Sequence, residues 1–495
     1  MKGKYLKRLA ALLPILLLCA GCNAASDSDS VPESIVISSA DSSISSGSSS
    51  DKSSSSGSSD TSSSISSSSS SPSSKPEESS SGDTASESGE YPGTYEESAP
   101  GYVESDPGYI ESTPVSESSE ASVSGSSSTS DEYSEPESSS STSAPPAEPS
   151  VPDDPIQSLI SQMSLKERIY QMFFVNPEQI TGGGTVLTPI DLTDKPVGGI
   201  LCMGDNLQSV PQTYEMLTGI QENAMRSGIG VFLAVDEEGG RVARCAWKLG
   251  TTEFDGMAVY GARNDADEAF NIGRTIGADI GALGFNVDFA PVADVDISPY
   301  NELGDRIFSG DPYVVANMVS NVVRGLKSSG VAATLKHFPG LGAENGNSHT
   351  ESAIVIDRTL EQLRSEEFVP FKSGIRAGAD FVMVGHQQVT AFGDELPADL
   401  SYTAVTEMLR GELGFEGIAV TDSQVMNTIS NLYYPRTAAV MSVKAGIDMI
   451  LTPGDLDDAV NGVYNAVLSG EISEERINES VTRILTVKQK MGLLA

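Results

Sequence analysis

Eight short runs of hydrophobic residues recur after Pro155, each about as long as a β-strand. In chain order the runs are Gln171–Val175, Gly198–Met203, Gly230–Val235, Asn286–Ala290, Val331–Leu335, Phe381–Val384, Ile418–Thr421 and Asp448–Leu451. The sequence between them has apolar residues at helical spacing, most clearly in Asp265–Leu283, Pro312–Ser329, Ala404–Leu413, Thr437–Ala445 and Ser473–Met491. Strands that alternate with helices predict an α/β fold with a parallel sheet. The sheet is expected to be a (β/α)8 TIM-type barrel, with a doubly wound open sheet as the alternative.

The folded region is predicted to cover residues 153–495 and to open with a helix, because apolar residues recur at helical spacing from Ile156 to Tyr170. Residues 23–152, in contrast, are mostly Ser with Asp, Glu, Pro and Gly, and they show no apolar periodicity. Such a segment cannot bury enough apolar surface to offset its chain entropy. We therefore predict a disordered, acidic, Ser-rich linker in front of a single folded domain.

The first 22 residues have the pattern of a secretory signal peptide. A basic start precedes an apolar run from Leu9 to Leu18, and small residues stand before Cys22. An uncleaved anchor helix is the alternative, but it would need about 20 apolar residues. Ala20-Gly21-Cys22 resembles a bacterial lipoprotein processing site, although Cys19 stands where Leu is usual. We expect a lipidated Cys22 that anchors the protein at the extracellular face of the bacterial cytoplasmic membrane or at the cell surface.

Composition narrows the choice of partners and the redox chemistry. The chain has 495 residues and a formal net charge of −39, and both the linker and the folded region are acidic. This charge argues against nucleic acid as a partner. With Cys22 lipidated, the folded region keeps Cys202 and Cys245. A disulfide between them is possible in an exported protein, and two buried free thiols are the simpler alternative.

Polar residues follow most of the predicted strands. They are Asp236, Asp294 with Asp296, Lys336 with His337, His386 and Asp422. The carboxyl ends of barrel strands meet at one face, so these side chains are expected to converge. Taken singly, each Asp has an alternative role as the N-cap of the next helix, and each His as a hydrogen-bonded core residue.

Candidate catalytic residues are densest in the stretch Leu335–His349, LKHFPGLGAENGNSH. It contains two of the chain's three histidines. Its Pro and Gly residues are predicted to end the strand and to start a loop that carries a cation and two imidazoles. No pattern requires a metal or a cofactor, so we expect neither. No Cys and His spacing suits zinc, Asp294-Val295-Asp296 lacks the remaining EF-hand ligands, and no Walker-type phosphate loop occurs.

Four motifs in this order carry a family resemblance: DEEGGRVAR at 236–244, KHFPG at 336–340, Ser-His at 348–349 and GFEGIAVTDS at 414–423. The chain from about Ile156 to its end resembles glycoside hydrolase family 3, most closely the single-domain β-N-acetylglucosaminidases. The resemblance favours the barrel over the open sheet. It implies a retaining β-N-acetylhexosaminidase that takes terminal β-linked N-acetylglucosamine from cell-wall or other glycans, and we expect a monomer.

The resemblance also implies a role for individual residues. Asp422 matches the catalytic nucleophile, and His349 matches the general acid, which later acts as the base. Sugar-binding positions of the family correspond to Asp236, Arg244, Arg306, Lys336 and His337. For Arg306 a structural ion pair with Asp294 or Asp305 is an equal alternative. The chain ends soon after the last predicted helix, so we expect no second domain of the kind that supplies the acid in the family's β-glucosidases.

Three positions depart from the family pattern. Relatives have an Asp two residues before the catalytic His, where this chain has Asn347, and Glu344 is a candidate replacement for the missing charge. Leu341 stands where relatives commonly have His, and Ser423 follows Asp422 in place of a second Asp. These departures keep open the alternative of a catalytically weakened surface protein that binds glycans. A β-glycoside phosphorylase or β-glucosidase of the same family is a further alternative, since a neutral or cationic His acid tolerates phosphate better than a carboxylate would.

Overall fold

The computed structural model describes residues 154–344, 346, 351 and 353–495 of the chain. Its centre is a sheet of eight parallel strands. In sheet order these are β11 (Ile418–Thr421), β9 (Phe381–Val384), β7 (Ala332–Phe338), β6 (Val287–Asp288), β3 (Phe232–Val235), β2 (Gly199–Leu201), β1 (Phe173–Val175) and β12 (Ile450–Leu451). The first and last strands also meet, because Val420 of β11 pairs in parallel with Met449, just before β12. The sheet therefore closes, and the predicted (β/α)8 barrel is confirmed.

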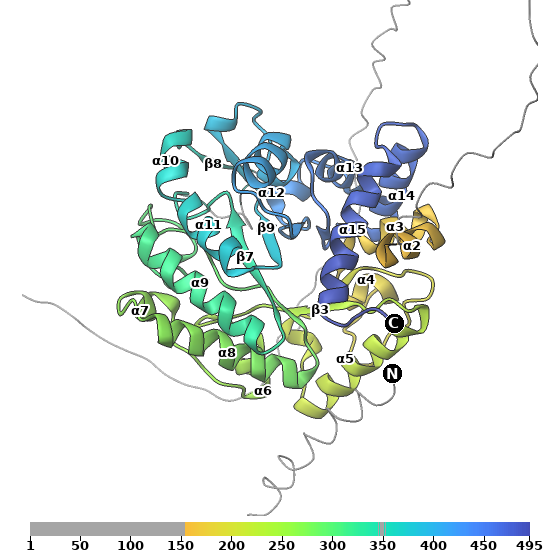
Figure 1. Cartoon of the computed structure of the whole chain (residues 1–495), viewed down its shortest axis with the longest axis horizontal. Coiled ribbons are helices and arrows are strands. Elements are labelled where there is room, and N and C mark those ends of the chain that lie inside the picture. Colours follow the sequence, from red (N-terminus) through yellow and green to blue (C-terminus); the bar gives the residue numbers. More distant parts are fainter. Residues whose placement is uncertain (1–153, 345, 347–350, 352) are drawn as a thin grey trace, which may run out of the picture. The chain divides into compact units, whose positions relative to one another are not determined.

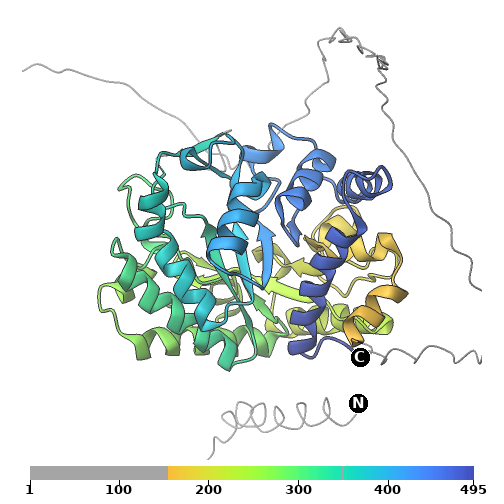
Figure 2. The ribbon, with the colours of Figure 1, turned by 45° about the horizontal axis from the view of Figure 1, so that its top comes forward.

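Helices surround the barrel (Figures 1 and 2). The longer ones are α5 (Val210–Ala224), α8 (Ala266–Leu283), α9 (Pro312–Ser328), α11 (Phe368–Ala377), α13 (Pro435–Ala445), α14 (Leu456–Leu468) and α15 (Glu474–Lys490). The shorter ones are α2 (Pro155–Gln162), α3 (Leu165–Gln171), α4 (Pro177–Thr181), α6 (Arg244–Leu249), α7 (Met257–Gly261), α10 (Leu360–Ser365) and α12 (Asn427–Ser430). Figure 1 shows α15 beside α2 and α3, so the first and last described helices share one side of the barrel.

Phenylalanine rings on or directly after different strands fill the barrel. The ring centroids of Phe174 and Phe289 are 5.2 Å apart, and those of Phe232 and Phe381 are 5.1 Å apart. All four side chains are completely buried. Burial of this size stabilises a fold by about 2 to 3 kcal/mol for each ring, so these contacts hold the strands that carry the site.

Helices α8 and α9 approach each other closely at two glycines. A Cβ atom on Gly273 would lie 2.2 Å from the carbonyl oxygen of Val322, and one on Gly325 would lie 2.2 Å from that of Phe270. Any larger residue would push the helices apart. The spacing of the two helices therefore depends on these glycines.

Two small sheets extend the strand ends. Strand β4 (Glu237–Gly239) pairs antiparallel with β5 (Val242–Ala243), and β8 (Ile354–Ile356) pairs in parallel with β10 (Gln387–Val389). The β4–β5 hairpin carries most of the DEEGGRVAR motif, so it presents that motif at the carboxyl end of β3.

The predicted continuous helix from Ile156 to Tyr170 is wrong, because the structure has α2 and α3 with a break between them. The Ser164 hydroxyl accepts a hydrogen bond from the backbone N–H of Glu167 at 3.2 Å, and the Glu167 carboxylate accepts one from the N–H of Ser164 at 2.7 Å. This capping box starts a new helix at Leu165. The apolar spacing is the same on both sides of the break, so periodicity alone did not reveal it.

Two other boundaries differ from the prediction. Strand β7 continues past Leu335 to Phe338, with a shift of register against β9, so Lys336 and His337 belong to the strand and not to the loop. The segment predicted as the helix Ala404–Leu413 is a π-helix over Thr403–Glu412. The other predicted strands and long helices lie where the sequence placed them, within one to three residues.

Cys202 and Cys245 are free and buried. Burial raises the pKa of both thiols, so both are neutral and unreactive. The predicted signal peptide, Cys22 and the linker lie outside the described residues. Within the described part of the chain, no helix is long and apolar enough to span a membrane.

Candidate active site

Asp236 and Lys336 meet at the carboxyl ends of β3 and β7. The Lys336 ammonium lies 2.9 Å from Asp236 Oδ1 and 2.6 Å from Glu238 Oε1. The Lys336 side chain is only 3% exposed, and Asp236 retains 17% exposure. Burial alone would lower the pKa of Lys336, but the two carboxylates outweigh it and raise the pKa. Lys336 is therefore a fixed cation whose Asp236 partner remains accessible from outside.

Glu238 joins Lys336 to Arg306, which lies in the short helical turn Gly304–Arg306. Arg306 Nε and Nη2 each donate to Glu238 at 2.8 Å. Burial alone would raise the pKa of Glu238, but the two cations hold it at about 2. Arg306 thus makes a structural ion pair, as the alternative reading anticipated, but its partner is Glu238. Asp294 and Asp305 do not fill that role, since Asp305 pairs with Arg241 at 3.1 Å.

Arg244 begins α6 and is partly buried. Its Nε is buried and has no hydrogen-bond partner in the described part of the chain. The helix itself is held by Glu237, whose carboxylate accepts from the N–H groups of Cys245 and Ala246 at 2.7 and 2.9 Å. A buried donor without a partner is costly, so Arg244 has a capacity for a polar ligand.

His337 is fixed by Asp294, which is completely buried. The His337 Nδ1 lies 2.8 Å from Asp294 Oδ2, and the other oxygen accepts from the N–H of Leu341 at 2.6 Å. Gln387 donates to the His337 carbonyl at 3.1 Å. These bonds fix the ring and the start of the following loop together. Leu341, which stands where relatives have a His, packs into the hydrophobic core.

Asp422 follows β11 and is partly buried. Its backbone N–H donates to the Val384 carbonyl at 2.8 Å, and its Oδ1 accepts from the N–H of Ser423 at 2.7 Å. Burial alone would raise the pKa of Asp422, but His337, His386, Lys336 and the Ser423 N–H together lower it. The predicted convergence of Asp422 with Lys336 and His337 is therefore present, and the carboxylate is kept charged.

The sequence did not show the contacts of two residues in this site. His386 was expected only as a strand-end residue, and it lies beside Asp399 and the residue after Asp422. Glu238 was not singled out, although it connects Arg306 to Lys336. The DEEGGRVAR motif contains Glu238, but its charge partners are 68 and 98 positions further along the chain, and no local pattern shows them.

His349 and Asn347 lie outside the described residues, so their predicted roles stay predictions. Glu344, the proposed replacement for the missing charge, is completely buried. Burial, together with Glu302 and Asp294, raises the pKa of Glu344 to about 8. The backbone N–H of Glu302 opposes this shift but does not outweigh it. Glu344 is therefore neutral near pH 7.

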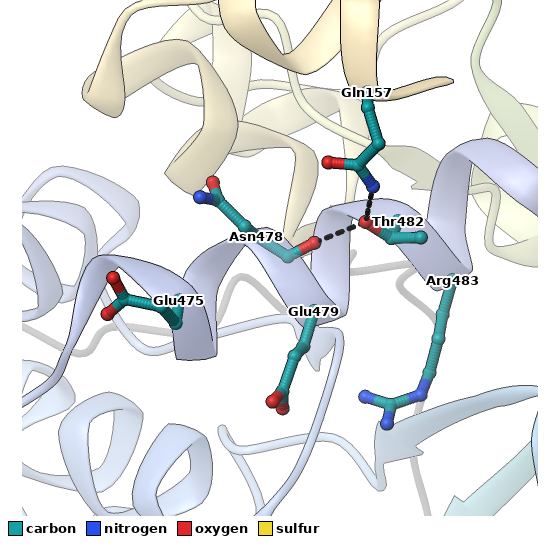
Figure 3. A pocket seen from close by; sticks show the side chains of 6 residues that line it. All are labelled: Gln157, Glu475, Asn478, Glu479, Thr482 and Arg483. Atoms are coloured by element: carbon teal, nitrogen blue, oxygen red, sulfur yellow. Dashed lines mark hydrogen bonds between the residues drawn. The ribbon is translucent and has the colours of Figure 1, made fainter. Parts of the chain in front are cut away.

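A surface pocket between α2 and α15 lies apart from these residues (Figure 3). Gln157 donates to the Thr482 hydroxyl at 3.1 Å across it, and Thr482 donates to the Asn478 carbonyl at 2.7 Å. The remaining lining residues are Glu475, Glu479 and Arg483. None of the predicted reacting or sugar-binding residues lines this pocket. It does not belong to the site at the strand ends.

The site thus has one charged, partly exposed carboxylate beside a lysine and two histidines, with further carboxylates and arginines around it. Among the described residues, no group of three or more His, Cys, Asp and Glu side chains is suited to hold a metal ion. A carboxylate nucleophile with many polar groups for hydroxyls, at the carboxyl face of a barrel, is the arrangement of a retaining glycoside hydrolase.

Comparison with known proteins identifies the family. Residues 164–487 match the glycosyl hydrolase family 3 N-terminal domain. The match covers more than half of the chain, so the protein belongs to this family and is a glycosidase.

The chain is also similar to individual proteins and to a solved structure. A protein named beta-hexosaminidase from Nitrosomonas eutropha is 34% identical over 295 residues, which cover 58% of this chain and 83% of that protein. Beta-hexosaminidase A from Pseudoalteromonas piscicida is 30% identical over 60% of this chain, but the match spans only 54% of that longer protein. The solved family 3 β-N-acetylglucosaminidase from Paenibacillus sp. is 35% identical with a TM-score of 0.63, covering 67% of this chain and 63% of that one.

Proposed function

We propose that this glycosidase removes terminal β-linked N-acetylglucosamine from cell-wall or other glycans, with retention of configuration. The observation that carries the proposal is the charged Asp422 carboxylate beside Lys336 and His337. The similarity to proteins named beta-hexosaminidase supports the choice of sugar.

In the first step Asp422 attacks the anomeric carbon as the glycosidic bond breaks, and a glycosyl ester forms. The leaving oxygen takes a proton from His349, whose role follows from the resemblance to the family. In the second step His349 accepts a proton from water, which attacks the same carbon and releases Asp422. Both steps pass through a cationic sugar, which the negative charge on Asp422 stabilises.

Asp236, Lys336, His337 and Arg244 bind the sugar hydroxyls in this proposal. Asp236 keeps an accessible face beside its Lys336 partner, and Arg244 has a donor without a partner in the described chain. Arg306 acts through Glu238, since the bidentate pair between them holds the carboxylate that Lys336 also contacts. We expect Arg306 to position Lys336. Its Nε and Nη2 atoms are occupied by Glu238, so they do not bind the sugar.

The test compares nitrophenyl β-N-acetylglucosaminide with nitrophenyl β-glucoside, each with and without phosphate. The proposal expects hydrolysis of the first, at least about tenfold slower release from the second, and no dependence on phosphate. A sugar phosphate product would identify a phosphorylase instead. Preference for the glucoside would identify a β-glucosidase.

A glycan-binding protein without turnover is the second candidate, because Asn347 removes a charge from the catalytic loop. If neither substrate is cleaved while calorimetry shows that N-acetylglucosamine oligomers bind, this alternative is correct. We further propose that the protein is a monomer, anchored to the outer face of the membrane through a lipid on Cys22. The apolar run before Ala20-Gly21-Cys22 supports the anchor.

A further inference from the structure

His386 is the one histidine to which neither the sequence nor the family resemblance assigned a role. It follows β9, and only 3% of it is exposed. Its Nδ1 lies 3.0 Å from Asp399 Oδ1, in the short helical turn Ala398–Leu400. Its Nε2 lies 2.9 Å from the carbonyl oxygen of Ser423, the residue after Asp422. The ring therefore bridges a buried carboxylate and the backbone beside the nucleophile.

Hydrogen bonding alone indicates the charge of this ring. A carbonyl oxygen can only accept, and an ionised carboxylate can only accept, so both ring nitrogens must donate. A ring with protons on both nitrogens is an imidazolium cation. The second oxygen of Asp399 accepts a bond from Gln424 at 3.3 Å, so both carboxyl oxygens have a partner. Burial alone would lower the pKa of His386, but Asp399, Asp422 and the Ser423 carbonyl outweigh it and raise the pKa to about 9.

The same contacts hold the backbone next to Asp422. The Ser423 N–H donates to Asp422 Oδ1 at 2.7 Å, and the Ser423 carbonyl accepts from His386. On the other side, the hydroxyls of Ser423 and Thr452 are 2.5 Å apart, and Thr452 follows β12. Residue 423 is thus held between the ends of β9 and β12. Movement of His386 would move the N–H that fixes the orientation of the nucleophile.

The titratable groups that face this pair come from several elements. Lys336 and His337 from β7 face Asp422 and lower its pKa together with His386. Tyr433, before α13, faces Asp399, since burial and then that carboxylate raise the pKa of its phenol. Lys336, His337 and His386 all act on the pKa of Asp422 in the same direction. Only His386 among them also holds the neighbouring backbone.

We propose that His386 is a positioning residue, a cation paired with Asp399 that keeps Asp422 charged and correctly aimed. The kinetic part of this proposal rests on the proposed glycosidase function. In the first step the negative charge of Asp422 is consumed as the ester forms, and in the second step it returns. A cation beside Asp422 stabilises the departing carboxylate, so its loss slows release of the glycosyl ester in particular.

Nuclear magnetic resonance tests the charge without any need for activity. The full chain contains only three histidines, so protein labelled with ¹⁵N at His gives few ring signals, and His386→Gln identifies those of His386. Both nitrogens should resonate as imidazolium at pH 7.5, and Asp399→Asn should shift the titration of His386 downward. A neutral ring that titrates near pH 6.5 in the wild type would overturn the proposal. If His386→Gln does not fold, His337→Gln and His349→Ala assign His386 by elimination.

The pH profile of kcat/KM tests the effect on Asp422. His386→Gln should move the acid limb upward by about one pH unit, because an opposite charge at short range shifts a carboxylate by one to three units. Asp399→Asn should move it in the same direction. Lys488→Met, which changes a buried amine on α15 that does not act on Asp422, is the control and should leave the limb in place. Folded His386→Gln with a lower rate but an unmoved limb would show a merely structural role.

If the wild type has no activity, the proposed function fails while the resonance experiment still decides the charge of His386.

Discussion

At the scale of single residues, Asp422 shows how the fold produces reactivity. A carboxylate moved out of water normally gains a proton, yet Lys336, His337 and His386 keep this one charged. The charge depends on groups from β7 and β9, so it exists only in the folded barrel. The strand-end pattern identified Asp422, Lys336 and His337 correctly as neighbours, because barrel geometry brings any such ends together.

Asp422→Asn keeps the size of the side chain and removes the nucleophile. We expect kcat to fall at least about a thousandfold, while the thermal unfolding midpoint changes little, because no packing group is lost. Hydrolysis of nitrophenyl β-N-acetylglucosaminide and calorimetric unfolding measure the two effects. Azide added to Asp422→Ala should restore turnover with a glycosyl azide product. More than about a tenth of wild-type activity in Asp422→Asn would end the assignment.

Asn347 and Glu344 give a second prediction at this scale. Since Glu344 is neutral near pH 7, it does not supply the charge that Asn347 lacks. Asn347→Asp should therefore strengthen the hydrogen bond to His349 and raise activity on substrates with poor leaving groups. Nitrophenyl substrates should gain less, because their nitrophenol leaving group needs little protonation. The measurement is the ratio of the rate on a substrate with a poor leaving group to the rate on a nitrophenyl substrate.

Glu344→Gln is the matched variant, because it changes a carboxyl into an amide in the same loop. It should leave the rate at pH 6 to 7 nearly unchanged, since the group it replaces is already uncharged there. A large loss of activity on Glu344→Gln, with no gain on Asn347→Asp, would instead make Glu344 the partner of the acid.

At the scale of elements, the sequence predicted strands well and their boundaries less well. Short apolar runs identified all eight barrel strands, because each strand is buried on both sides. The break at Ser164 and the extension of β7 to Phe338 were missed. Both depend on a hydrogen bond or a pairing partner and not on hydrophobicity, so apolar spacing could not show them.

Lys488 on α15 carries a prediction about stability. Its ammonium is completely buried, donates to Gln171 Oε1 at 2.7 Å and lies 5.1 Å from the centre of the Phe232 ring. Burial lowers the pKa of Lys488 from 10.5 to about 7. As the pH falls from above 10.5, the unfolded chain gains the proton first, so stability is lost progressively until the pH passes below 7.

Lys488→Met replaces this cation with an apolar chain of similar length. It should raise the free energy of unfolding by about 1 to 3 kcal/mol at pH 6 and by less at pH 9.5, because the cost it removes grows as the pH falls from 10.5 and is complete only below about 7. Urea unfolding at the two pH values measures this difference. An equal change at both values would mean that packing, and not the buried charge, determines the effect.

At the scale of the whole molecule, long separation along the chain explains what the sequence left open. Lys336 pairs with Asp236 across 100 positions, and Arg306 pairs with Glu238 across 68. Residue types and strand ends indicate that such groups meet, but the choice of partner depends on side-chain geometry in the closed barrel. The alternative for Arg306 was therefore correct in kind and wrong in its partner. The signal peptide and the linker are predicted from the sequence alone.

Cys22→Ser tests whether this barrel is held at a membrane by lipid. A diacyl group on the mature Cys22 buries many methylenes, at about 0.8 kcal/mol each, which is enough for stable anchoring. The wild type should partition with membranes and into detergent, and mass spectrometry of its N-terminal peptide should show an acylated cysteine. Cys22→Ser should lose the lipid, while the control Cys19→Leu, which supplies the usual residue of the processing site, should keep it. An unmodified Cys22 in the mature wild type would contradict the lipoprotein assignment. A wild-type protein that stays in the membrane with its first residues intact would instead support the uncleaved anchor helix.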